Sequence, residues 1–209
     1  LAAQTTGERN TAVGYGAGDA ITTGAYNTGL GMSAMGGLTT GSYNTAIGYE
    51  ALIAASNTAS NNTAVGAAAL DANTTGANNT ALGYNSLDVN TTASSNTALG
   101  SESLGANTTG ASNSAVGANA LDANTTGDYN TALGSGALGA NTTASYNTGI
   151  GNNALTANTT GAANVAVGSG ALDANTTASY NTAIGKNALG ANTTGAANVA
   201  VGSGALDAN

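Results

Sequence analysis

A short motif of the form N-T-A-V-G recurs along this chain at a nearly constant interval. Consecutive copies are 17 residues apart, with a single interval of 18 residues between Asn44 and Asn62. Self-similarity at one period is the signature of a repeat protein, in which each unit buries its apolar face by stacking on its neighbours. The twelve copies begin at Asn10, Asn27, Asn44, Asn62, Asn79, Asn96, Asn113, Asn130, Asn147, Asn164, Asn181 and Asn198.

The composition excludes several functional classes. The 209 residues include no Cys, His or Pro, and only two cations, Arg9 and Lys186, against ten acidic residues. Disulfides, thiolate metal sites and histidine-based catalysis are therefore ruled out. A phosphate-binding surface would need many more cations, so no nucleic-acid partner is expected. No apolar run approaches the roughly 20 residues of a membrane span, and none is expected in this segment.

Within each unit, numbered 1 to 17 from its Asn, the residue types favour strands over helices. Position 5 is always Gly, and positions 12 to 14 mostly read Asn-Thr-Thr, both poor helix formers. We expect two short extended segments, N-T-A-V and A-L-D-A, separated by corners at the Gly and at N-T-T-G. The corner glycines are Gly14, Gly31, Gly48, Gly66, Gly83, Gly100, Gly117, Gly134, Gly151, Gly168, Gly185 and Gly202.

The face that points into the lumen is inferred from side-chain alternation along a strand. Val165 and Val199 replace the usual Thr at position 2, which suggests that this column is half buried. We therefore place positions 2, 4, 9 and 11 inside, and position 3, which is always Ala or Gly, outside. The predicted lumen residues are Val13, Leu30, Ile47, Val65, Leu82, Leu99, Val116, Leu133, Ile150, Val167, Ile184 and Val201 at position 4, and Leu52, Leu70, Leu121 and Leu172 at position 9.

Stacking places equivalent residues in ladders about 4.8 Å apart, so position-1 Asn side chains should hydrogen-bond along the axis. The outward column of small residues at position 3 suggests close approach by another chain.

The chain offers few groups for catalysis or ligand binding. The acidic residues occupy repeat columns rather than a unique site, and Ser and Thr have no suitable base, so no enzyme activity, cofactor or metal site is expected. Asn-Thr-Thr is an N-glycosylation acceptor, which raises the alternative of a glycan ridge, although turn chemistry, in which Asn and Thr bond their own backbone at corners, is the favoured interpretation. The ridge would comprise Asn73, Asn90, Asn107, Asn124, Asn141, Asn158, Asn175 and Asn192.

The motif resembles repeats of known surface proteins. N-V-A-V-G at Asn164–Gly168 is similar to the S-V-A-I-G motif of trimeric autotransporter adhesin heads, and NTAIGKNALGANTTGAAN at Asn181–Asn198 resembles the N-T-A-I-G-x-x-A-L repeats of phage tail fibres. The resemblance implies a left-handed parallel β-roll packed side by side as a homotrimer. The unit here is longer than the adhesin unit, and it usually carries Thr at position 2.

These observations predict an all-β parallel β-solenoid of about twelve 17-residue coils. Residues 1–9 would form a partial leading coil and residues 10–209 one repeat domain, an uncapped piece of a longer chain. The function expected is structural: the shaft or head of an extracellular fibre or adhesin on a cell surface or virion, with identical chains and a host surface or glycan as partners. The alternatives are an ice- or surface-binding solenoid and a subunit of an end-to-end filament.

Overall fold

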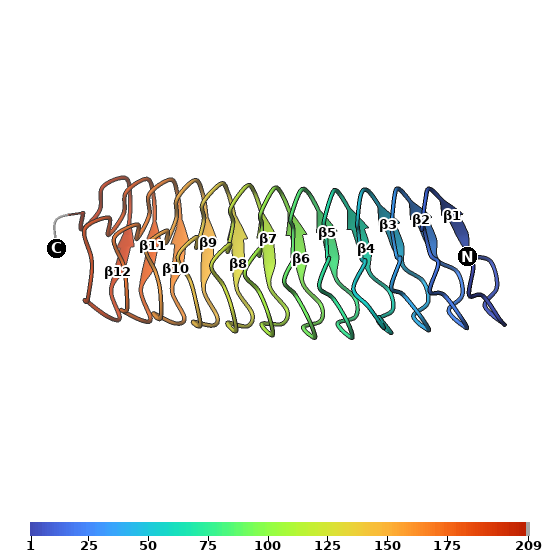
Figure 1. The fold of residues 1–209 in the computed structure, drawn as a ribbon. Coiled ribbons are helices and arrows are strands. Elements are labelled where there is room, and N and C mark those ends of the chain that lie inside the picture. Colours follow the sequence, from blue (N-terminus) through green and yellow to red (C-terminus); the bar gives the residue numbers. More distant parts are fainter. Residues whose placement is uncertain (208–209) are drawn as a thin grey trace.

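The chain forms a long rod of stacked coils. The computed structural model describes residues 1–207, and the first and last of its twelve strands lie at opposite ends of the rod (Figure 1). Residues 208 and 209, the last two of the predicted repeat domain, lie outside the described residues. Each coil contributes one three-residue strand: β1 (Thr11–Val13), β2 (Thr28–Leu30), β3 (Thr45–Ile47), β4 (Thr63–Val65), β5 (Thr80–Leu82), β6 (Thr97–Leu99), β7 (Ser114–Val116), β8 (Thr131–Leu133), β9 (Thr148–Ile150), β10 (Val165–Val167), β11 (Thr182–Ile184) and β12 (Val199–Val201).

All twelve strands belong to one parallel sheet, in which each strand pairs with the strands of the neighbouring coils. The pairing is in register, so that Thr80 lies opposite Thr97 and Leu82 opposite Leu99. Backbone hydrogen bonds between coils continue outside the strands, as in Leu70 N–H to the Ser86 carbonyl (3.0 Å) and Thr74 N–H to the Thr91 carbonyl (2.9 Å). The predicted parallel β-solenoid of about twelve coils is confirmed.

The return side of the coil is not a strand, which corrects the expectation for A-L-D-A. No strand occurs at positions 8 to 11 among the described residues. Instead, residues at positions 7 and 9 adopt a left-handed backbone, and the position-9 leucines have φ between +51° and +55°. This conformation costs an ordinary residue about 1–2 kcal/mol. Full burial of Leu contributes about 1.5–3 kcal/mol, which offsets the cost.

Glycine at position 5 is required for two independent reasons. Gly83 has φ +146°, where residues with a side chain are strained, and a Cβ placed on it would lie 2.3 Å from the Gly100 carbonyl oxygen of the next coil. The same arrangement recurs along the rod, so the predicted corner glycines are confirmed.

The lumen is narrow and is filled by small side chains together with one buried Leu per coil from the third coil to the eleventh, whereas the first two coils contribute Ile21, Met35 and Leu38. Position 3 points inward: Ala81 and Ala98, for example, are fully buried. The position-8 residue and the position-9 Leu, on the return side of the coil, are buried with the position-3 column. The position-1 Asn is buried too and lies on the same inward side of the strand. Side chains therefore alternate along the strand as predicted, but the inward face carries position 3, whereas positions 2 and 4 were predicted to point inward.

Three columns that were predicted to line the lumen lie on the surface. The position-2 Thr column is exposed or half-exposed, and the position-11 Ala column is half-exposed except at Ala191, which is exposed. The lumen prediction is wrong for Val13, Leu30, Ile47, Val65, Leu82, Leu99, Val116, Leu133, Ile150, Val167, Ile184 and Val201, which are exposed or half-exposed. It is confirmed for Leu52, Leu70, Leu121 and Leu172, which are fully buried.

The single 18-residue coil marks a change in the interior. Position 12 carries Ile21 and Leu38 in the first two coils, both buried, and Asn from Asn73 onward. At the junction Asn57 pairs with Leu38 across the coils. Its side-chain oxygen accepts a hydrogen bond from Ala59 N–H, and its buried amide nitrogen has no partner among the described residues. The extra residue thus separates an apolar interior column from an amide column.

The left-handed backbone at position 7 leads to a stability prediction. Ala68 has φ +55°, whereas Gly16, Gly136, Gly170 and Gly204 occupy the same column with φ between +63° and +68°. Ala68→Gly should raise the free energy of unfolding by about 0.5–1 kcal/mol, because relief of the left-handed strain exceeds the entropy cost of Gly. Urea unfolding monitored by circular dichroism measures this effect. Ala69→Gly, at a fully buried neighbour without positive φ, is the matched control and should destabilise the protein. A loss of stability in both variants would contradict the interpretation.

Candidate interaction surfaces

The sheet presents one continuous outward face, which we call the strand face: the position-2 and position-4 side chains of β1 to β12. Its position-4 column is aliphatic throughout, and the exposed fraction is 41% for Leu99, 56% for Val13 and 68% for Val201. The column beside it is Thr in nine coils and Ser114, Val165 and Val199 in the others. An exposed apolar surface of this length is unusual for an isolated soluble chain and is typical of an interaction surface.

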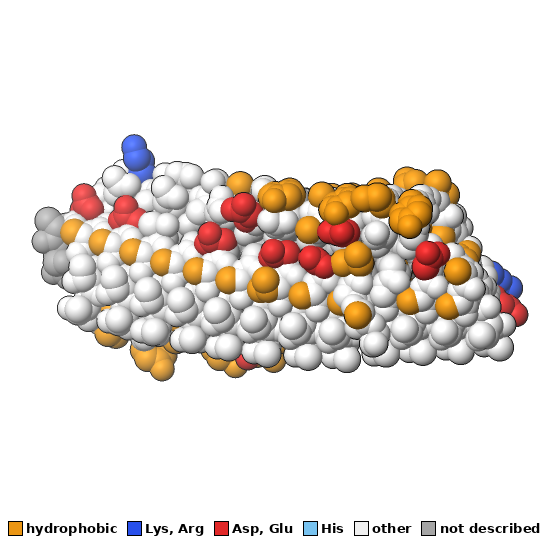
Figure 2. Space-filling model, in the orientation of Figure 1, with side chains coloured by type: hydrophobic (Ala, Val, Ile, Leu, Met, Phe, Trp, Pro, Cys, Tyr) orange, Lys and Arg blue, Asp and Glu red, His pale blue; other side chains and the backbone are white. Residues whose placement is uncertain are grey.

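Charge is excluded from the strand face. No acidic or basic residue occurs at position 2 or 4 of any coil, although the chain has a formal net charge of −8. The carboxylates lie elsewhere, chiefly on the return side, and are spread along the rod (Figure 2). The two cations lie near opposite ends of the rod. Like-charge repulsion between copies of this chain would therefore be smallest where two strand faces meet.

Two ladders of asparagine side chains run through the interior. In the position-1 ladder, Asn96 N–H donates to the Asn79 Oδ1 atom at 2.9 Å, while the Asn96 amide donates to the Gly110 carbonyl at 2.9 Å. This axial ladder was predicted and is confirmed. In a second ladder at position 12, the Asn124 amide donates to Asn107 Oδ1 at 2.8 Å and to the Gly127 carbonyl at 3.0 Å. The sequence pattern from which this second ladder could have been predicted is the recurrence of Asn-Thr-Thr.

The second ladder rules out the glycan ridge in the folded protein. The acceptor asparagines Asn73, Asn90, Asn107, Asn124, Asn141, Asn158 and Asn175 are fully buried, and Asn192 is 3% exposed. Their amides are engaged in turn and ladder hydrogen bonds, so no oligosaccharide can be accommodated there. The exposed hydroxyl column at position 14, Thr126 for example, lies beside them on the surface.

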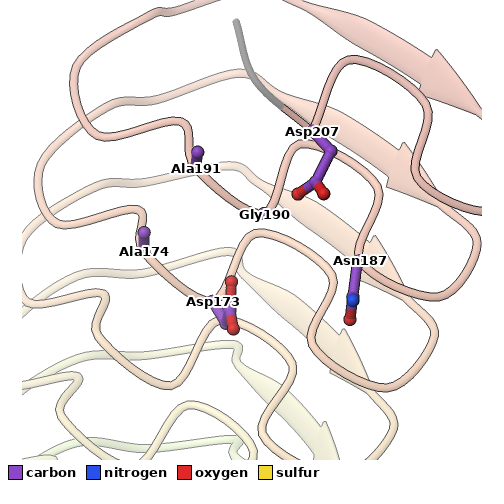
Figure 3. A pocket seen from close by; sticks show the side chains of 6 residues that line it. All are labelled: Asp173, Ala174, Asn187, Gly190, Ala191 and Asp207. Carbon is purple, nitrogen blue, oxygen red and sulfur yellow. The ribbon is translucent and has the colours of Figure 1, made fainter.

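Shallow acidic hollows occur on the return side wherever position 10 is Gly between two Asp. Gly190 lies between Asp173 and Asp207, whose carboxylates point toward it, with Asn187 beside them (Figure 3). A similar hollow joins Asp88, Glu102 and Asp122 around Gly105. Among residues 1–207, no group of three or more carboxylates is arranged to hold a metal ion.

Partial burial disfavours the ionised form of these aspartates. Burial raises the pKa of Asp88 and Asp122 above the ordinary value, and the nearby Glu102 carboxylate adds to the effect on each. For Asp122 a hydrogen bond from Asn119 opposes the increase. Burial also raises the pKa of Asp71, with a contribution from Glu50. These side chains therefore reduce stability when they are charged.

Tyrosines form two exposed edges beside the strand face. Position 6 carries Tyr15, Tyr49 and Tyr84, and position 17 carries Tyr26, Tyr43, Tyr129, Tyr146 and Tyr180. Two pairs at position 17 stack between consecutive coils: Tyr26 with Tyr43, and Tyr129 with Tyr146. Arg9 lies over the other side of the Tyr26 ring, with its guanidinium carbon 5.1 Å from the ring centroid.

Comparisons with protein-family models, with curated proteins and with solved structures gave no match to this chain. In the part of the chain that the structure describes, no helix is long and apolar enough to cross a membrane.

The Asn ladder leads to a second prediction. Asn124→Ala should lower the free energy of unfolding by at least about 2 kcal/mol, because it leaves the buried Asn107 oxygen and the Asn141 amide each short of a partner. Thr126→Ala, two residues away and exposed, should change it by less than about 0.5 kcal/mol. Chemical denaturation of both variants tests this, and equal losses would show that the ladder does not stabilise the rod.

The aspartate pKa values predict a pH dependence with a definite sign. Between the ordinary and the raised pKa, the folded protein binds more protons than the unfolded chain, so stability contributed by Asp88 and Asp122 falls as pH rises through that interval. The double variant Asp88→Asn/Asp122→Asn should therefore be more stable than the wild type at about pH 7, and this advantage should shrink toward about pH 3. Thermal unfolding across this pH range measures the difference. A variant that is less stable at neutral pH would contradict the assignment.

Proposed function

We propose that this chain is a structural segment of an extracellular fibre or adhesin, in which identical rods pack side by side through their strand faces. The observation that carries the proposal is the uncharged strand face, with its continuous aliphatic column at position 4, on an otherwise acidic rod. Twelve coils at about 4.8 Å give a face on the order of 55 Å long. Lateral association would remove this face from water, and the resemblance to adhesin heads and tail fibres favours three chains.

The mechanism that we propose is mechanical spacing and repeated display. Coil-to-coil hydrogen bonds along the whole rod make it a stiff spacer. Equivalent surface positions recur in every coil, so a weak contact with a host surface or glycan would be multiplied along the axis. The residues outside the strand face, including the acidic return side and the Tyr edges, would remain on the surface of such an assembly.

One observation favours a second candidate, an ice- or surface-binding solenoid. The position-2 Thr column faces outward from a parallel sheet, at the repeat spacing of the coils, and is not part of the lumen. This candidate needs the strand face to be free in solution, whereas the fibre proposal needs it to be covered. The oligomeric state therefore separates the two.

We expect the wild-type protein to have about three times the 19.6 kDa chain mass by native mass spectrometry and sedimentation. Leu82→Asp/Leu133→Asp places two carboxylates on the strand face and should give folded monomers with an unchanged circular dichroism spectrum. The dissociation follows because each buried unpaired carboxylate costs several kcal/mol.

Thr92→Asp/Thr126→Asp is the matched control, because it adds the same charge at exposed positions away from the strand face. This variant should assemble like the wild type. A wild-type protein that stays monomeric at every concentration tested would overturn the proposal. Thermal hysteresis or inhibition of ice recrystallisation by that monomer would instead support the second candidate.

A further inference from the structure

The position-17 column holds two pairs of tyrosine rings in contact across consecutive coils. The ring centroids of Tyr26 and Tyr43 are 4.9 Å apart with planes 8° from parallel, and those of Tyr129 and Tyr146 are 5.2 Å apart at 10°. The backbone at each of the four residues is left-handed, with φ between +56° and +64°. The two residues of each pair therefore have equivalent backbone conformations in consecutive coils.

Coil-to-coil hydrogen bonds hold each pair in place. Tyr43 N–H donates to the Ala25 carbonyl at 3.0 Å, and Tyr146 N–H donates to the Asp128 carbonyl at 3.1 Å. Each bond joins the second Tyr of a pair to the residue that directly precedes the first Tyr. The two Cα atoms of a pair are thus fixed one coil apart, and only rotation about the side-chain bonds remains.

The four phenols are also open to solvent. The exposed fractions are 42% for Tyr26, 60% for Tyr43, 56% for Tyr129 and 63% for Tyr146. Their backbone positions flank the strand face and do not belong to it. An oxidant that acts at the surface can therefore reach both rings of a pair.

We propose that Tyr26–Tyr43 and Tyr129–Tyr146 are sites of oxidative cross-linking to dityrosine, with hydrogen peroxide and a haem peroxidase as the oxidant. Each phenol loses one electron and one proton, and the peroxide takes up both pairs to become two molecules of water. The two tyrosyl radicals join through a bond between the Cε carbons ortho to the oxygens. The hydrogens on those carbons then move to the oxygens, which restores two phenols.

Proximity selects these pairs over the other tyrosines. Holding two reacting groups together makes their combination effectively intramolecular, which accelerates it greatly over random encounter. Tyr180 lies two coils beyond Tyr146, with Ala163 between them in the column. Tyr15, Tyr49 and Tyr84 never occupy consecutive coils at position 6. The cross-link would join residues 17 positions apart and clamp two coils together, which restricts the unfolded chain as a disulfide does.

The experiment treats the full chain with horseradish peroxidase and limiting hydrogen peroxide, followed by digestion with a protease that cleaves after acidic residues. Tyr26 and Tyr43 then lie in one peptide, after Asp19 and up to Glu50, and Tyr129 and Tyr146 lie in another, after Asp128 and up to Asp173. An intrachain link makes its peptide lighter by two hydrogen atoms, whereas a link between chains joins two peptides. Fragment spectra identify the linked residues.

We expect both peptides to show the intrachain loss together with dityrosine fluorescence. Tyr43→Phe should abolish the link in the first peptide only, and Tyr146→Phe in the second only, because Phe keeps the stacking but forms no phenoxyl radical. Tyr180→Phe and Tyr49→Phe, which remove unpaired phenols, should leave both links unchanged. Predominant links to Tyr180 or Tyr49, links mainly between chains, or oxidation without any link in the two pairs would each overturn the proposal.

Discussion

Hydrogen bonds along the rod axis hold each coil to its neighbours, and the other features of the molecule follow from them. Each coil offers its backbone N–H and carbonyl groups to its neighbours, both in the strands and along the return side. These bonds form only when equivalent residues lie above one another, and hence the chain keeps a nearly constant repeat. The buried asparagines extend the same pattern to side chains, since each amide satisfies a neighbour that would otherwise be unpaired. The one coil with an extra residue is where a buried amide nitrogen is left without a partner.

A narrow lumen follows from the short coil and determines the character of the surface. From the third coil to the eleventh the interior holds small side chains, Asn and a single Leu per coil, which leaves no room for the branched residues of position 4. They are placed instead on the outward side of the sheet, next to a column of hydroxyls. Because the charged residues occupy other positions, the rod has one apolar, uncharged face and several polar ones. The proposal that identical rods pack side by side rests on this segregation and not on a concave pocket.

The same regularity accounts for the chemistry at the edges. Each side chain lies next to the side chains at the same repeat position in the coils above and below. The residue types at that position in consecutive units therefore determine which side chains touch. Two Tyr in consecutive units become a stacked pair, and two Asp separated by a Gly unit become a shallow acidic hollow. Such features are local variations on a uniform scaffold. They can change without disturbing the fold, because the buried columns are unaffected.

The repeat, the strand in N-T-A-V, the corner Gly, the axial Asn ladder and the buried Leu could all be predicted from the sequence, because each follows from period, backbone freedom or hydrogen-bonding capacity. Which face of the strand points inward depends on the packing of the whole coil. Alternation places positions 1 and 3 on one side and 2 and 4 on the other, but it does not say which side is buried. The lumen width decides it: position 3 is always Ala or Gly because the opposite wall, with its inward Leu, leaves no space for more. The second Asn ladder was not predicted for a different reason: it depends on left-handed turns on the return side, which a pattern of strands does not anticipate.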